Sequence, residues 1–431
     1  MTKNIFTKYH YYFSSIANNK HFIFVSISFI FALVFSFTAQ IATFRVLDLH
    51  EYGIFSVLYS LSAIISVIGT AGFDVSTLRF FPNLDVEQKS IFFKYSLKCT
   101  LFFTTLTSPI YFLICTIFYS IEINTALYAI IGCSIWSFIR VFSSLLRALG
   151  RFNTSLFIDR YCRDGLITIV GICAIFSGRP MSIVYILLVI VAGGALGMLI
   201  ALPIFTIHAY RRIETKHVEN NIWLVASMGL LLINVLEMTF SRIDIILCSY
   251  LSGPNTSALL NIISVISNII TIPTAALTII IMPLISKNYE SGQTIKLRTM
   301  LIYYTVINFG FGSMIALFIF IFPDVIFGFF GHEALKHAGQ SNLFVVLSAK
   351  LFLTLFSAAA PLILMSGRVR GLIFSYLGVL VLKLVGMIYF VPIFGLVAGV
   401  WNMTAGMIIL TLCQLFIAIR IFTDRTRQTL A

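Results

Sequence analysis

The sequence predicts an all-α membrane protein that crosses the bilayer about twelve times. Of its 431 residues, 59% are hydrophobic and 10% are charged, which is more apolar surface than a soluble core of this length can bury. Uncharged apolar runs of membrane length recur along the whole chain, and most charged residues stand in the short breaks between them. These observations exclude a soluble domain, and the net charge of +13 therefore does not indicate nucleic-acid binding.

The predicted spans are the apolar runs that separate polar breaks. They cover 22–44, 54–81, 91–119, 125–147, 153–178, 181–210, 221–250, 257–286, 297–323, 340–366, 371–391 and 394–421. The fifth is the least typical, because its first half carries four charges.

The second span illustrates the pattern that the others repeat. A polar turn leads into a stretch from Gly53 to Phe73 without Asp, Glu, Lys or Arg, long enough to cross a hydrocarbon layer of about 30 Å. It is followed by Asp74 and Arg79 and then by Pro82, which favours the end of the helix. We expect these two charges near one face of the bilayer.

The basic residues of the loops predict the orientation. The apolar run after the basic N-terminus is too long for a signal-peptide core, so we interpret it as a retained first helix. With the N-terminus in the cytoplasm, the inner loops and tails collect seventeen Lys and Arg residues, and the outer loops collect Arg45, Arg179 and Lys336. Both termini are therefore expected on the cytoplasmic side.

The hydrophilic segment 211–219 divides the chain into two halves of six spans. We predict a first bundle over 1–210, a cytoplasmic connection over 211–219 and a second bundle over 220–431. A weak internal repeat, with helices ending near Pro82 and Pro283, supports two related halves. The longest outer loop, around 324–340, is expected to form an interfacial helix.

Charges inside spans are the candidate functional residues, because a charge in the bilayer must be paired or face water. Nine basic residues stand against five acidic ones. The basic residues are Arg79, Lys94, Lys98, Arg140, Arg160, Arg163, Arg242, Lys350 and Lys383, and the acidic ones are Asp74, Asp159, Asp164, Glu237 and Asp244. This surplus predicts a hydrated cavity that receives an anionic ligand, for which the planar Arg side chain suits phosphate oxygens.

Alternatives stay open for several of these residues. Asp159 with Arg163 and Arg160 with Asp164 have i,i+4 spacing, so internal ion pairs that let the fifth helix insert are one interpretation. Arg140 and Arg147 share a helix face without an acid and are better ligand candidates, although Arg147 could instead reach the inner headgroups.

Polar side chains also follow one face of the seventh and eighth spans. They are Asn234, Glu237, Ser241 and Asp244 on the seventh, and Ser257, Asn261, Ser264, Asn268 and Thr271 on the eighth. One interpretation is hydrogen bonding between helices. The other is a surface for sugar hydroxyls, with Asn261 and Asn268 as substrate ligands and Glu237 or Asp244 coupling transport to an H⁺ or Na⁺ gradient. Arg242, Lys350 or Lys383 could equally be structural partners of these acids.

No cofactor or metal is expected. The seven cysteines lie inside apolar stretches without CxxC spacing, and no His cluster suits a metal. Short outer loops and the lack of a paired-carboxylate or Ser/His/Asp constellation argue against an enzyme such as a glycan polymerase. An exporter of organic cations would favour an acidic, aromatic cavity, which the basic surplus opposes.

Several segments resemble a known family. They are LHEYGIFSVLYSL and AGFDVSTLRFFP within 49–82, RIDIILCSYLSGPNTSALLNIISVISNII from Arg242, IIMPLISKNYESG from Ile280, MSGRVRG at 365–371 and VPIFGLVAGVWNMTAG at 391–406. Together they are similar to the bacterial polysaccharide flippases of the multidrug/oligosaccharidyl-lipid/polysaccharide (MOP) exporter superfamily, over essentially the whole chain.

The resemblance implies a V-shaped, MATE-like transporter of the bacterial inner membrane. Its substrate would be an undecaprenyl-diphosphate-linked oligosaccharide, such as an O-antigen repeat unit, moved from the cytoplasmic to the periplasmic leaflet. The family's cationic cavity corresponds in kind to Arg79, Arg140, Arg160, Arg163, Arg242, Lys350 and Lys383. The protein is expected to act as a monomer within the lipid bilayer, with a polymerase of the same glycan pathway as a candidate partner. A multidrug exporter of the same superfamily is the alternative.

Overall fold

The computed structural model describes residues 20–178, 181–209, 220–331 and 339–430, and this part of the chain contains helices and no strand. Within these residues, ten helices are long and apolar enough to cross a membrane, and the bent pair of α16 and α17 makes an eleventh. The remaining predicted span, 153–178, is helical from Phe152 to Ser177. It is less apolar than the other spans, because its first half carries four charged residues. The chain is a multi-pass membrane protein.

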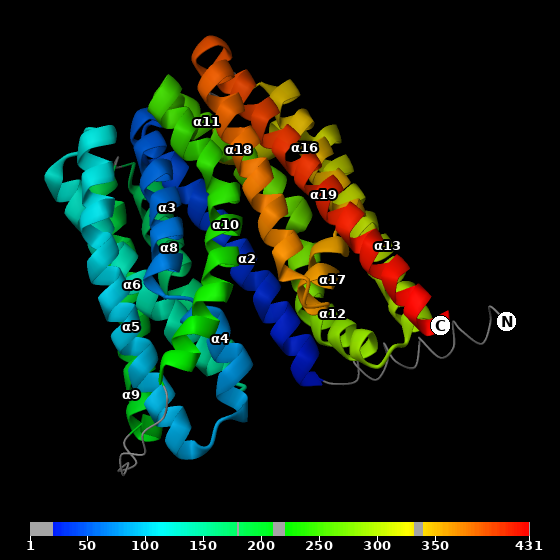
Figure 1. Cartoon of the computed structure of the whole chain (residues 1–431). Coiled ribbons are helices and arrows are strands. Elements are labelled where there is room, and N and C mark those ends of the chain that lie inside the picture. The colour runs from blue at the N-terminus through cyan, green and yellow to red at the C-terminus, as the bar shows by residue number, and fades with distance from the viewer. Residues whose placement is uncertain (1–19, 179–180, 210–219, 332–338, 431) are drawn as a thin grey trace.

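The helices before residue 210 form the first group in Figure 1. Their bounds are α2 (Lys20–Val46), α3 (Leu49–Gly69), α4 (Phe73–Phe80), η1 (Phe81–Asn83), α5 (Val86–Leu113), η2 (Ile114–Phe118), α6 (Ile123–Ala148), α7 (Phe152–Leu156), η3 (Phe157–Gly165), α8 (Leu166–Ser177) and α9 (Ile183–Ala209).

The helices after residue 219 form the second group. Their bounds are α10 (Asn220–Ser252), α11 (Pro254–Asn268), η4 (Ile269–Thr271), α12 (Ile272–Glu290), α13 (Thr294–Ile321), α14 (Pro323–Phe330), α16 (Gln340–Leu355), α17 (Ala359–Met365), α18 (Val369–Phe394) and α19 (Leu396–Leu430). The predicted interfacial helix in the loop after α13 corresponds to α14. The predicted connection 211–219 lies outside the described residues, so the division into two bundles there stays a prediction.

The two groups form a V, as Figure 1 shows. They separate toward the end that holds α4, α12 and α17, which we call the wide end, and meet at the opposite, narrow end. The first half of α10 is an exception, because at the wide end it packs on α4 of the first group. At the narrow end α3 packs on α11, and α10 packs on both α3 and α18. Arg45, at the end of α2, adds a further link, since its guanidinium donates to the carbonyl oxygens of Phe329 (2.7 Å) and Gly328 (2.5 Å) in α14.

The second predicted span is a broken helix. α3 starts at an N-cap where the Asp48 carboxylate accepts the Glu51 backbone N–H (2.6 Å). It ends at Gly69, because Ala71 and Gly72 adopt positive φ values of 51° and 78°, and α4 begins at Phe73. The prediction of one continuous helix over 54–81 was therefore wrong. Because of this break, Asp74 lies in the first turn of α4, where its side chain is buried.

Gly53 allows the closest approach between the two groups. A Cβ atom at this position would overlap the backbone carbonyl of Pro254, the first residue of α11. We predict that Gly53→Ala pushes α3 and α11 apart and lowers the free energy of unfolding by about 1–3 kcal/mol. Gly229→Ala is the matched control, since nothing lies within 4 Å of its Cβ position in α10. Thermal melting of both variants in detergent tests this, and an equal change in both would contradict it.

Candidate functional site

The structure pairs one predicted substrate ligand with one predicted coupling residue. Lys383 of α18 and Asp244 of α10 form a salt bridge of 2.6 Å, and each side chain is 2% exposed. The Lys383 ammonium also donates to the Phe240 carbonyl (2.8 Å) and lies 4.1 Å from the centre of the Phe240 ring. Asn402 donates to Asp244 (3.3 Å) from α19. The pair thus joins three helices in a closed site, which favours the structural interpretation for Lys383 and Asp244.

The two asparagines predicted to bind sugar hydroxyls have different environments. Asn261 of α11 is buried and donates to the hydroxyls of Tyr52 (3.0 Å) and Ser56 (2.9 Å) on α3. It therefore holds the two helix groups together at the narrow end. Asn268 is exposed at the last residue of α11. The structure does not bring the two into one hydrogen-bonding surface.

Arg140 of α6 binds Asp74 across the first group. Its Nη2 lies 3.0 Å from the Asp74 carboxylate, and Nε also donates to the same oxygen (3.3 Å). The carboxylate is further held by the Thr70 hydroxyl (3.1 Å). Asp74 is 5% exposed and Arg140 is 22% exposed, so one edge of this guanidinium remains open to solvent.

The other two arginines near the same end differ from Arg140. The Nε atom of Arg147 is buried and has no hydrogen-bond partner within the described part of the chain. Arg79 is exposed, with its guanidinium 5.6 Å from the centre of the neighbouring Phe80 ring. Neither forms a described ion pair with Asp74, but the charges of Asp74 and Arg140 act on Arg147.

The charges of the fifth span pair in an unexpected register. Residues 157–165 form the π-helix η3, which has more residues per turn than an α-helix. Arg163 pairs with the adjacent Asp164 (2.7 Å), and Arg160 lies 3.8 Å from Asp159. Ser36 of α2 donates to Asp164 and accepts a hydrogen bond from Arg160 (3.3 Å). The predicted i,i+4 pairs were wrong because they assumed α-helical geometry.

An aromatic platform lies beside these charges. The Arg163 guanidinium is 4.2 Å from the centre of the Trp136 ring and 5.9 Å from that of Tyr59. Arg242 of α10 approaches the same Tyr59 ring at 5.5 Å. Sequence reasoning missed Tyr59 and Trp136, although Tyr52, Phe55 and Tyr59 follow one face of α3, a spacing that could have indicated the platform.

Arg242 differs from Arg140, Arg163 and Lys383 in lacking a carboxylate. Among the described residues, no acid lies within salt-bridge distance of its half-buried side chain, and no hydrogen bond from it is formed. The charges of Arg163 and Arg160 act on it from η3. Two guanidinium groups from opposite helix groups therefore converge on the Tyr59 ring with a net positive charge.

Lys350 of α16 is in a similar position. Its side chain is half-buried, and the described part of the chain offers its ammonium neither a hydrogen-bond acceptor nor a carboxylate within bonding distance. The positive charges of Lys383 and Arg242 act on it, and Asp244 is already bonded to Lys383. We define Arg160, Arg163, Arg242 and Lys350 as the central cations. An anion placed among them would relieve their mutual repulsion.

Among the five candidate acids of the spans, Glu237 is the one with an exposed side chain. Its side chain is exposed on α10, and within the described residues it forms no ion pair or hydrogen bond. The charge of Arg140 acts on it, and it in turn acts on Tyr376 of α18. A carboxylate that is accessible and unbonded can take up a proton or a cation, so the coupling prediction stays open for Glu237 and not for Asp244.

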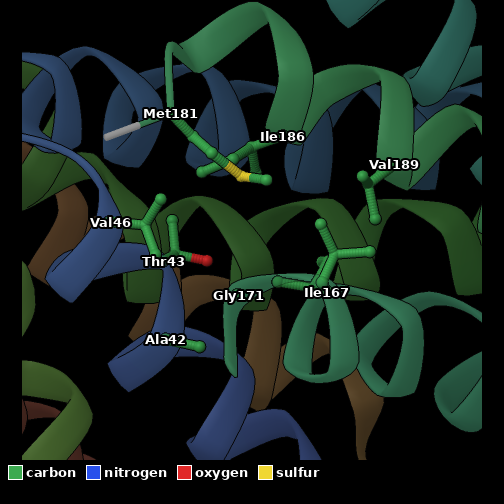
Figure 2. A pocket seen from close by; sticks show the side chains of 9 residues that line it. Ala42, Thr43, Val46, Ile167, Gly171, Met181, Ile186 and Val189 are labelled. Atoms are coloured by element: carbon green, nitrogen blue, oxygen red, sulfur yellow. The ribbon is translucent and has the colours of Figure 1, made fainter. Parts of the chain in front are cut away.

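The small pocket in Figure 2 is part of the packing between α2, α8 and α9. Its volume of about 10 Å³ has room for at most one water molecule. Ala42 and Gly171 face each other there, and a Cβ on Gly171 would come within 2.7 Å of the Ala42 Cβ. The described residues also include no cluster of three or more His, Cys, Asp or Glu side chains that could hold a metal.

Comparisons with known proteins agree with this architecture. Residues 230–345 match the MatE family model. An inward-facing multidrug resistance MATE family transporter of the MOP superfamily superposes with a TM-score of 0.71 at 15% identity, over 94% of this chain and 99% of that one. The outward-facing form gives 0.67 at 15% identity, over 95% and 96%. A MATE structure in the bent conformation gives 0.68 at 14% identity, over 96% and 97%.

No curated protein sequence matches the chain. The family model covers α11, η4, α12, α13 and α14 with parts of the helices on either side. The structural matches, in contrast, extend over nearly the entire chain and over both arms of the V. The chain therefore has the V-shaped fold of the MATE transporters of the MOP superfamily.

Proposed function

We propose that this protein moves a lipid with a phosphorylated headgroup across the bacterial inner membrane by alternating access. The substrate is an undecaprenyl-diphosphate-linked oligosaccharide, carried from the cytoplasmic to the periplasmic leaflet, with both termini of the protein in the cytoplasm. The observation that supports this proposal most directly is Arg242, a half-buried side chain without a described carboxylate partner. It shares the Tyr59 ring with Arg163, and the charge of Arg160 also acts on it.

The central cations suit a diphosphate better than a neutral or cationic substrate. A diphosphate offers several oxygens and two or more negative charges, and Arg binds such groups through two parallel hydrogen bonds. Arg163 and Arg160 already share Asp164 and Asp159, which makes them secondary contacts for a ligand. Arg242 and Lys350 keep their full hydrogen-bonding capacity, and we assign the primary contacts to them.

Alternating access requires that the contacts at the narrow end break. In the present state α3 packs on α11 through Gly53 and Asn261, and Arg45 holds α14. The matching MATE structures include an inward-facing and an outward-facing form. A substrate bound at the central cations would bring the arms together at the wide end, since it interacts with α10 and α16 on one side and η3 on the other. Protonation or cation binding at Glu237 would couple this change to an H⁺ or Na⁺ gradient.

The second candidate is a multidrug exporter. Two of the matching structures are described as multidrug resistance transporters, and an accessible Glu237 beside Tyr376 offers one negative charge for an organic cation. The central cations oppose this candidate, because a cationic drug would be repelled by them.

A reconstitution experiment separates the two candidates. Proteoliposomes would contain undecaprenyl-diphosphate-linked oligosaccharide with a fluorophore on the glycan, and a membrane-impermeant quencher would report the fraction in the outer leaflet. We expect protein-dependent exchange of the labelled lipid under an ion gradient, and no export of ethidium. Export of ethidium without movement of the lipid would contradict the proposal and support the drug exporter.

A further inference from the structure

A second basic site lies at the wide end of the second helix group, away from the central cations. A pocket of about 590 Å³ opens between the start of α18 and the last turns of α19. Three arginines line it. Arg368 lies in the turn before α18, Arg370 in α18 and Arg420 in α19. Among the described side chains that line the pocket, the others are glycine or apolar and none is acidic.

The backbone adds to the positive character of this pocket. Gly367 turns the chain with a φ of 76°, and α18 begins at Val369 and continues for 26 residues. The first turn of a helix presents backbone N–H groups without intrahelical partners and a partial positive charge. A Cβ atom on Gly371 would come within 3.3 Å of the Ile417 side chain, so the two helices pack closely at this pocket.

The surface next to the pocket is strongly apolar. Phe374 on α18 is 71% exposed, and Phe416 and Ile419 on α19 are 68% and 56% exposed. A soluble anion would use the arginines and leave these side chains unused. A ligand with a phosphate at one end and hydrocarbon chains at the other would contact both parts of the surface.

We propose that this pocket binds the headgroup phosphate of an anionic phospholipid from the surrounding leaflet. Arg370 and Arg420 bind the phosphate oxygens from the two helices, and the acyl chains lie along Phe374 and Phe416. Arg370 precedes Lys383 by thirteen positions, which is roughly 20 Å along α18 at 1.5 Å per residue, and the charge of Lys383 acts on the central cation Lys350. The site is thus separate from the central cations and does not depend on the identity of the transported substrate.

Native mass spectrometry and thermal melting of the purified protein with added phosphatidylglycerol test this site. Arg370→Gln/Arg420→Gln is the test variant, and Lys287→Gln/Lys296→Gln is the control, because it removes the same charge from exposed positions that do not line this pocket. We expect phosphatidylglycerol, but not phosphatidylcholine, to raise the melting temperature of the wild type and of the control. The test variant should bind the lipid about tenfold more weakly, because it loses at least one charged hydrogen bond to the phosphate.

Three outcomes would overturn the proposal. The first is an equal loss of binding in the test and control variants, which would indicate general attraction to basic loops. The second is an equal effect of phosphatidylcholine. The third is full stabilisation by inorganic phosphate alone, which would assign the pocket to a soluble anion.

Discussion

Replacing Arg242 by Gln is expected to reduce flipping of the diphosphate-linked oligosaccharide by about ten- to a hundredfold, because a charged hydrogen bond contributes about 1.5–3 kcal/mol. The melting temperature should stay constant or rise, since no described carboxylate loses a partner and a half-buried charge is removed. Arg242→Lys should retain part of the activity, because it keeps the charge without the planar geometry. The quenching assay in proteoliposomes and a melting curve measure both effects.

Arg140→Gln is the matched control for this prediction. It removes the same group but leaves Asp74, which is 5% exposed, without its ion pair. Stability and flipping should therefore fall together, and Asp74→Asn in the same chain should recover the stability. Unchanged flipping in Arg242→Gln, at normal protein levels, would rule out Arg242 as the primary phosphate contact.

Replacing Lys383 by Met is expected to cause the largest loss of stability. Asp244 is 2% exposed, so the variant leaves a buried carboxylate whose remaining described contact is one hydrogen bond from Asn402. Breaking a buried pair in this way costs about 3–5 kcal/mol. The double variant Lys383→Met/Asp244→Asn removes both charges and should recover most of the melting temperature. Thermal unfolding in detergent measures these differences.

Lys350→Met provides the comparison within the same charge cluster. Because Lys350 has no described carboxylate partner, its removal should leave the melting temperature constant or higher while reducing flipping. If Lys350→Met were as destabilising as Lys383→Met, the distinction between a structural pair and a substrate contact would be wrong. If the double variant at 383 and 244 melted as early as the single one, packing rather than charge would account for the effect.

The membrane spans could be predicted from the sequence because the signal is local. A run of about 20 apolar residues crosses the hydrocarbon layer whatever its neighbours are. The predicted bounds of α2, α5 and α13, for example, agree with the helices in the structure to within a few residues at most of their ends. The break after Gly69 was not predicted, since Ala71 adopts a positive φ that an alanine residue does not favour. The π-helix η3 was not predicted either, since α-helical spacing was assumed for this span.

The set of candidate charges was also accessible from sequence, because a charge within an apolar run is expensive wherever the helix lies. The role of each charge was not. Asp244 had three possible cationic partners in the sequence, and it pairs with Lys383, which is 139 positions away. Arg140 and Arg147 were together the better ligand candidates on their helix face, yet Arg140 binds Asp74 from another helix.

The amino-acid sequence by itself determined that this protein spans the membrane many times as helices and carries more basic than acidic residues within its predicted spans, since both follow from local composition. Only the tertiary structure decided which cations are neutralised. Ion pairs depend on distances of a few ångströms between helices far apart in the chain, and helix packing sets these distances. Helix packing leaves Arg242 and Lys350 without a described acidic partner. This distinguishes the candidate phosphate contacts from the ion pairs that hold the helices together.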